Sequence, residues 1–92
     1  MKYIKVRWRH EFPDEPIILY SELDEGRWET RKVYVFRSGP AGYASDRESS
    51  RSVMLSLEPV PPLDEIASDP QFESHEISEQ EFEQIWVDAH SR

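Results

Sequence analysis

The chain has 92 residues, of which 37% are hydrophobic and 33% charged, and its formal net charge is −8. A chain of this length has a modest core, so residues 1–92 are expected to form a single domain. It contains no cysteine, which excludes disulfides, thiolate metal sites and a cysteine nucleophile. It also has no signal-peptide-like or membrane-length apolar run, so a cytoplasmic location is expected.

The negative charge is concentrated near the C-terminus. Residues 1–57 contain ten bases and nine acids, whereas residues 58–92 contain ten acids and one base, a net charge of −9. Nucleic acids and anionic membranes are bound through cationic patches, so neither is an expected partner. We expect another protein as the partner, and a basic one in particular.

Residues 2–58 are expected to be rich in strands. Residues 2–10 alternate apolar and basic side chains, which is the period of a half-buried strand. Four later segments share the β-branched and aromatic bias of strands: IILYSEL, RWETRKVYVFRS, AGYAS and VMLSLEPV. The polar segment 45–52 lacks any period and is predicted to be a mobile loop.

The acidic part, residues 62–90, is expected to be helical. Pro62 suits the start of a short helix near 62–68, and Ser78 with Glu81 forms a capping box that begins a helix near 79–90. The second helix has one apolar stripe, formed by Phe82, Ile85, Trp86 and Ala89. The sequence therefore predicts an α+β fold, in which this amphipathic helix covers one face of an antiparallel meander of four to five short strands.

The stretch SELDEGRWETRKV, residues 21–33, predicts a hairpin with Gly26 in its turn, because glycine accepts a positive φ. The favoured register pairs Leu23 with Trp28, so that both face the core. A shift by one residue would place Leu23 opposite Arg27 instead. In the favoured register Lys32 lies on the apolar side, where its ammonium is expected to reach the edge of the sheet.

The same register gathers Tyr20, Glu22, Arg27, Glu29 and Arg31 on the opposite face. These residues form either a solvent-exposed network of alternating charges or a platform that binds a partner or small anion. In the second case the guanidinium of Arg31, beside Tyr20, would donate two hydrogen bonds to the bound group. Together with acids of the C-terminal helix, they give the candidate partner-binding residues: Tyr20, Glu22, Arg27, Glu29, Arg31, Glu79, Glu83 and Asp88.

Motifs for catalysis or metal binding are sparse. His10, His75 and His90 lack the spacing of metal ligands and are expected at the surface, with His75 in a loop. Neighbouring carboxylates such as Asp24 and Glu25 need not converge on a substrate. There is no nucleophile elbow and no glycine-rich phosphate loop. We therefore predict no catalytic residue, no metal and no cofactor, and expect that the chain is not an enzyme.

Three blocks of the sequence are distinctive: YIKVRWRHEFPDEPIILYSELDEGRWETRKVYVFRSG, PVPPLDEI and EISEQEFEQIW. Together they resemble a family of small bacterial proteins catalogued as a domain of unknown function. The resemblance covers nearly the whole chain and implies a complete, stand-alone protein, but it brings no activity or site. In size and charge the chain also resembles the immunity proteins encoded beside bacterial toxins.

Two functions are therefore expected. The first is a non-catalytic, immunity-like inhibitor of a basic bacterial toxin. The alternative is a small-ligand or nucleotide sensor that uses the charged sheet face. Either protein would be a monomer or a weak homodimer, since an exposed edge strand permits self-association without requiring it.

Overall fold

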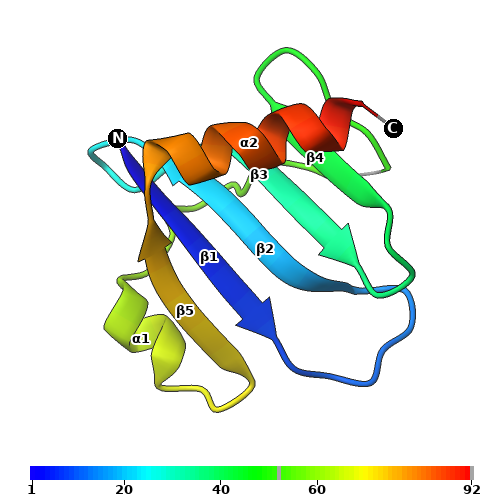
Figure 1. Cartoon of the computed structure of the whole chain (residues 1–92). Coiled ribbons are helices and arrows are strands. Elements are labelled where there is room, and N and C mark those ends of the chain that lie inside the picture. The colour runs from blue at the N-terminus through cyan, green and yellow to red at the C-terminus, as the bar shows by residue number, and fades with distance from the viewer. Residues whose placement is uncertain (52, 92) are drawn as a thin grey trace.

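The computed structural model describes residues 1–51 and 53–91, which form one antiparallel sheet and two helices (Figure 1). The predicted α+β fold is confirmed. In chain order the elements are β1 (Lys2–Trp8), β2 (Pro16–Leu23), β3 (Glu29–Phe36), β4 (Ala41–Ser45), α1 (Leu63–Ala67), β5 (Phe72–Ile77) and α2 (Glu79–His90).

The sheet has the order β4-β3-β2-β1-β5, so only its first four strands form the predicted meander. After β4 the chain crosses to the opposite edge of the sheet, forms α1, and returns as β5 beside β1 (Figure 1). The prediction that residues 62–90 are helical missed β5, and His75 lies in this strand instead of a loop. The strand FESHEI is largely polar, as charged edge strands often are, and therefore lacks a clear hydrophobic signal.

The predicted strand over VMLSLEPV is wrong, because residues 53–60 pair with no strand of the described sheet. Val53 is 2% exposed and faces the core, whereas Leu57 is 85% exposed. The free edge of β4 is instead occupied by the turn after it, through a bridge between Ala44 and Ser49. Residues 46–51 form this turn, and Ser52 of the predicted loop lies outside the described residues.

Helix α2 begins where its capping box predicts. The Glu81 backbone N–H donates to Ser78 Oγ at 3.0 Å, which satisfies one of the amides left unpaired at a helix N-terminus. Phe82 is fully buried and Ala89 is 4% exposed, so the predicted apolar stripe faces the sheet. The helix lies across one face of the sheet, near the N-terminal end of β1 (Figure 1).

Each face of the sheet carries its own hydrophobic cluster. On the α2 side, Tyr3, Tyr20 and Val33 pack with Phe82 and Ala89. On the other side, buried residues of β1 and β2 pack under α1 and the segment that precedes it: Ile4, Val6 and Leu23 with Val60, Leu63 and Ile66. Both faces are therefore at least partly covered, so the charged residues of β2 and β3 do not form an open outer face.

The predicted register, continued from Leu23 and Trp28, pairs Ser21 with Thr30 and Leu19 with Lys32. The hairpin of β2 and β3 instead pairs Ser21 with Lys32 and Leu19 with Tyr34, a slip of two residues. Since side chains alternate with period two, this slip keeps most residues on their predicted faces. An irregularity at Glu22/Leu23 then places Leu23 opposite Glu29.

Two details of the turn differ from the prediction. Trp28 is 45% exposed and does not face the core. The positive φ of the turn is at Arg27, at 65°, and not at Gly26. The turn is held instead by Asp24, whose Oδ1 accepts hydrogen bonds from the backbone N–H groups of Gly26 and Trp28, each at 2.9 Å. An aspartate that accepts from backbone amides downstream is a common turn device, so Gly26 is not needed for its φ.

Candidate functional site

Arg31, the central residue of the predicted charged platform, lies beneath α2. Its Nε and Nη2 donate to the two oxygens of Glu22 at 2.9 and 2.6 Å, a bidentate pair between neighbouring strands. It also forms an ion pair with Glu83 of α2. Its guanidinium carbon lies 5.0 Å from the centre of the Phe82 ring and 5.1 Å from that of Trp86. Arg31 thus joins the sheet to the helix.

The surroundings of Arg31 shift the pKa values of its neighbours. Hydrogen bonds from Arg31, and a further one from Thr30, hold the pKa of the Glu22 carboxyl below its ordinary value despite burial. Burial and the nearby Glu22 carboxylate raise the pKa of the Tyr3 hydroxyl to about 12. Glu22 is therefore ionised and Tyr3 neutral at physiological pH. Both belong to a structural network on the inner side of the helix.

Only Glu22 and Tyr20 of the predicted platform share a face with Arg31. Tyr20 is on the same face as Arg31 but is only 6% exposed. Arg27 lies at the hairpin turn, where its Nε donates to the carbonyl of Val60 at 2.8 Å and its Nη2 to that of Pro61 at 2.7 Å. It thereby ties the 53–62 segment to the hairpin. The predicted grouping of five residues on one open face is therefore wrong.

Glu29 points to the face opposite Arg31, where it pairs with Lys32 at 2.8 Å. The two side chains are 6% and 5% exposed, and Lys32 does not reach the edge of the sheet as predicted. Glu29 also accepts hydrogen bonds from Ser21 Oγ at 2.8 Å and from the Ser56 backbone N–H at 2.7 Å. Lys32 in turn donates to the Met54 carbonyl at 2.9 Å.

The ammonium of Lys32 remains charged in this buried position. Burial acts to lower its pKa, but hydrogen bonds with Glu29 and with Tyr34, whose hydroxyl is 3.0 Å away, outweigh that effect and raise the pKa. A fully hydrogen-bonded ion pair of this kind fixes where the 53–62 segment crosses the sheet.

The predicted acids of α2 have different surroundings. Glu83 binds Arg31, and Asp88 accepts a hydrogen bond from Gln84 Nε2 at 3.0 Å. Glu79 is exposed at the start of the helix. Only Glu79 and Asp88 of the eight candidate residues are exposed acids; the others are wholly or partly buried.

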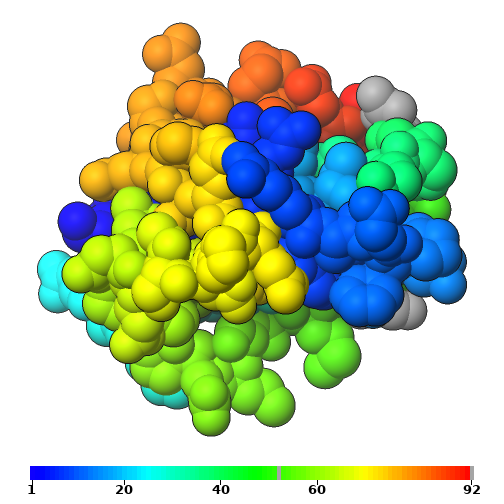
Figure 2. Space-filling model, turned by 90° about the horizontal axis from the view of Figure 1, so that it is seen from below, coloured from blue at the N-terminus to red at the C-terminus, as the bar shows by residue number. Residues whose placement is uncertain are grey.

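The fold gathers other acids along the edge of the sheet formed by β5. Helix α1 packs on β5, and α2 follows β5 directly, so this strand links the acids of the three elements. Seen from below, α1 and the start of β5 form one surface that continues to the start of α2 (Figure 2). We call this surface the acidic edge; its residues are Asp64, Glu65, Asp69, Glu73, Glu76, Glu79 and Glu81.

Most acids of the acidic edge form no salt bridge among the described residues. Glu73 pairs with Arg9 and lies 3.3 Å from His75 Nε2. Within residues 1–51 and 53–91, its other six acids lie in no salt bridge. Four of these six lie in the segments near 62–68 and 79–90, which the sequence assigned to helices. The sequence did not predict β5, the strand against which α1 packs and which α2 directly follows.

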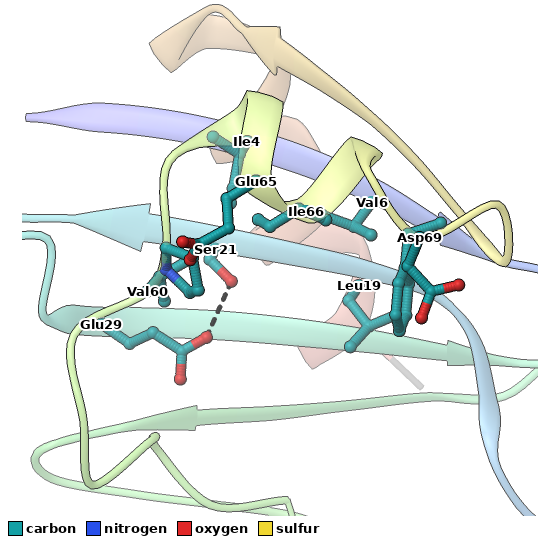
Figure 3. Close-up of a pocket in the computed structure, with 11 residues that line it drawn as sticks. Ile4, Val6, Leu19, Ser21, Glu29, Val60, Glu65, Ile66 and Asp69 are labelled. Atoms are coloured by element: carbon teal, nitrogen blue, oxygen red, sulfur yellow. Dashed lines mark hydrogen bonds between the residues drawn. The ribbon is translucent and has the colours of Figure 1, made fainter.

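A pocket of about 330 Å³ lies beside the acidic edge, between α1 and the face of the sheet opposite α2 (Figure 3). Its wall is mostly apolar and comes from β1, β2, the 53–62 segment, α1 and β5: Ile4, Val6, Leu19, Val60, Ile66 and Phe72. The Glu65 and Glu29 carboxylates lie at one end near Val60, and the Asp69 carboxylate lies at the other end beside Leu19 (Figure 3). This pocket was not predicted.

The histidines lie apart from one another, and in the described part of the chain no three His, Cys, Asp or Glu side chains are grouped so that they could hold a metal ion. His10 Nδ1 accepts from the Phe12 backbone N–H at 2.9 Å, so its Nε2 carries the proton that it donates to the Pro16 carbonyl at 2.8 Å. His90 stacks on Tyr43, with the ring centres 3.7 Å apart. Both histidines hold loops or termini in place.

His90 is expected to make the stability of the fold depend on pH. Its Nε2 lies 2.6 Å from a Glu48 oxygen and its Nδ1 lies 2.9 Å from the Trp86 carbonyl oxygen, so both nitrogens donate when the ring is protonated. Burial lowers the pKa of His90, but the bonds to Glu48 and Trp86 outweigh it and raise the pKa. Because the pKa of His90 is higher in the folded chain than its ordinary value of 6.5, protonation of His90 stabilises the fold. This stabilisation is complete below pH 6.5 and disappears as the pH rises through the pKa of His90 in the folded chain.

The test is to measure the free energy of unfolding from about pH 5.5 to 8.5 for the wild type and for His90→Gln. The difference between them should be largest at the acid end and shrink as the pH rises. Glu48→Gln should reduce the same pH dependence, because it removes the carboxylate partner. A difference that stays constant across this range would contradict the assignment.

No helix in the described residues is both long and apolar enough to span a membrane. The fold and its surfaces define a small α+β domain, in which the charges of β2 and β3 serve the structure and unpaired acids collect at one edge. The chain belongs to the family described as Domain of unknown function (DUF6881), whose model matches residues 2–91. Comparison with curated proteins gave no match, and neither did comparison with solved structures.

Proposed function

We propose that this chain is a non-catalytic protein-binding module that uses the acidic edge to bind a basic protein, in the manner of an immunity protein bound to a basic bacterial toxin. The observation that carries the proposal is the acidic edge itself: six acids from three elements and Asp69 from the turn before β5 lie along it, and six of these seven acids are in no salt bridge among the described residues. A surface of one sign attracts a partner of the opposite sign and speeds its association.

The charge also opposes self-association through β5. Pairing of two β5 edges would bring the negatively charged residues Glu73 and Glu76 of one copy close to those of the other, and like charges across neighbouring strands are destabilising. A monomer that meets a basic partner is consistent with this surface.

The alternative, a sensor of small anions on the charged sheet face, depended on Arg31 and Tyr20. The guanidinium of Arg31 already binds Glu22 and Glu83, and Tyr20 is almost fully buried. An anion would have to displace two carboxylates to reach Arg31. These contacts favour the protein-binding proposal over the sensor.

The proposal is tested by purifying the basic proteins encoded beside the gene and measuring their affinity for three forms of the chain. Glu76→Lys with Glu79→Lys reverses two exposed positions of the acidic edge. The control, Glu11→Lys with Glu25→Lys, makes the same change in net charge at exposed positions elsewhere. We expect the first variant to bind at least about tenfold more weakly than the control. Equal weakening by both variants would contradict a role for this edge.

A further inference from the structure

We infer that the pocket under α1 is a binding site for a small organic cation: a primary amine or guanidine carried on an apolar body. This inference goes beyond the proposed function, because a small molecule could occupy the pocket with or without a protein partner. It starts from the size of the pocket. At about 330 Å³ it lies at the lower end of the range of small-molecule sites and well above an apolar cavity that binds benzene.

The wall of the pocket selects an apolar body. Val6, Leu19 and Phe72 line the space from the sheet and Ile66 lines it from α1, and these side chains offer no hydrogen-bonding group. A ring or short alkyl chain between them would remove apolar surface from water on both sides, which is the main source of affinity in such sites.

The charged residues at the pocket select a cationic head. Among the described residues, three carboxylates and no basic side chain line it. The Glu29 charge is balanced by Lys32, whereas Glu65 and Asp69 lie in no salt bridge within the described residues. An anionic ligand would be repelled from both ends of the pocket.

The Glu65 end is the better place for the cation. Oδ1 of Asp69 already accepts a hydrogen bond from the Gln71 backbone N–H at 2.9 Å. At the other end Glu65 points toward Ser21, whose hydroxyl donates to Glu29 (Figure 3). An ammonium there could donate to Glu65 and to Ser21 Oγ, which combines a charge-assisted bond with a neutral one. The apolar body would then extend past Ile66 toward Phe72.

The experiment is an NMR titration that observes the methyl groups of Ile4, Leu19, Val60 and Ile66. The probe is 4-phenylbutylamine, and its matched controls are 4-phenylbutanol and 4-phenylbutyrate, which share the apolar body but carry no charge or a negative one. We expect saturable shifts at these methyl groups with the amine, binding about tenfold weaker with the alcohol, and none with the carboxylate. Equal binding of amine and carboxylate, or no saturable shift at these methyl groups, would overturn the inference.

Two single substitutions on α1 make the test specific. Glu65→Gln removes the carboxylate that would hold the cation, and Asp64→Asn removes a neighbouring charge that does not line the pocket. Both side chains are exposed, so both variants are expected to fold. Glu65→Gln should weaken amine binding by about tenfold while leaving the affinity for the alcohol unchanged, and Asp64→Asn should change neither. Equal effects of the two substitutions on the amine would contradict the proposed position of the cation.

Discussion

Arg31→Met is expected to reduce the free energy of unfolding by about 3 kcal/mol or more, the cost of leaving a buried charge without its partner. The substitution removes the bidentate donor to Glu22, which is 7% exposed, and the residue that joins the sheet to α2. Chemical denaturation at neutral pH measures the loss.

Two controls separate this network from a general effect of removing arginine. Glu83→Gln removes the half-exposed partner of Arg31 and should cost at most about 1 kcal/mol, as surface ion pairs do. Combining Arg31→Met with Glu22→Gln should recover part of the lost stability, because no buried carboxylate then lacks a cation. A loss below about 1 kcal/mol for Arg31→Met alone would contradict a structural role for the pair.

The acid side of the stability curve gives an independent check. The pKa of Glu22 in the folded chain lies below its ordinary value of 4.5. The ionised Glu22 therefore contributes fully to the free energy of unfolding above pH 4.5, and this contribution is lost as the pH falls through the pKa of Glu22 in the folded chain. The difference in stability between the wild type and Arg31→Met should therefore narrow on acidification. A difference that widens at low pH would contradict the assignment.

Glu29→Ala is expected to have a comparable effect, about 3 kcal/mol, because it leaves the ammonium of Lys32 buried without its carboxylate. It also releases the backbone N–H of Ser56, which donates to Glu29 at 2.7 Å. Denaturation measures the overall loss. Hydrogen exchange at Ser56 reports whether the 53–62 segment has come away from the sheet, and its amide should exchange faster in the variant.

A volume-preserving double substitution is the control for this pair. Glu29→Leu with Lys32→Met replaces both charges by apolar groups, and it should be much less destabilising than Glu29→Ala, since replacing a whole buried pair is often nearly neutral. Unchanged protection of Ser56 in Glu29→Ala would show that the pair does not anchor the segment.

Local patterns predicted the helices well, because their signals lie within a few residues. The capping box of Ser78 and Glu81 and the stripe that includes Phe82 place α2 correctly. Pro62 likewise marks the start of α1. Alternation also correctly placed Leu23 and Lys32 on the face opposite Arg31, even though the register slipped by two residues.

The candidate site could not be predicted in the same way, because it depends on contacts between distant parts of the chain. One irregularity in the β2–β3 pairing turns Glu29 to the side of Lys32, which separates it from Arg31. Helix α2 then covers the face that the hairpin pattern alone would leave open. The polar strand β5 carries little hydrophobic signal, yet it is the element that assembles the acidic edge and one wall of the pocket.

The most direct test of the acidic edge as a binding surface is the association rate constant with a basic partner, measured across a series of salt concentrations. If the acidic edge steers the partner electrostatically, kon falls by about tenfold or more between low and high salt. At low salt, Glu76→Lys with Glu79→Lys should reduce kon, whereas the control Glu11→Lys with Glu25→Lys should not. A kon that changes with neither salt nor the edge substitutions would contradict the proposal.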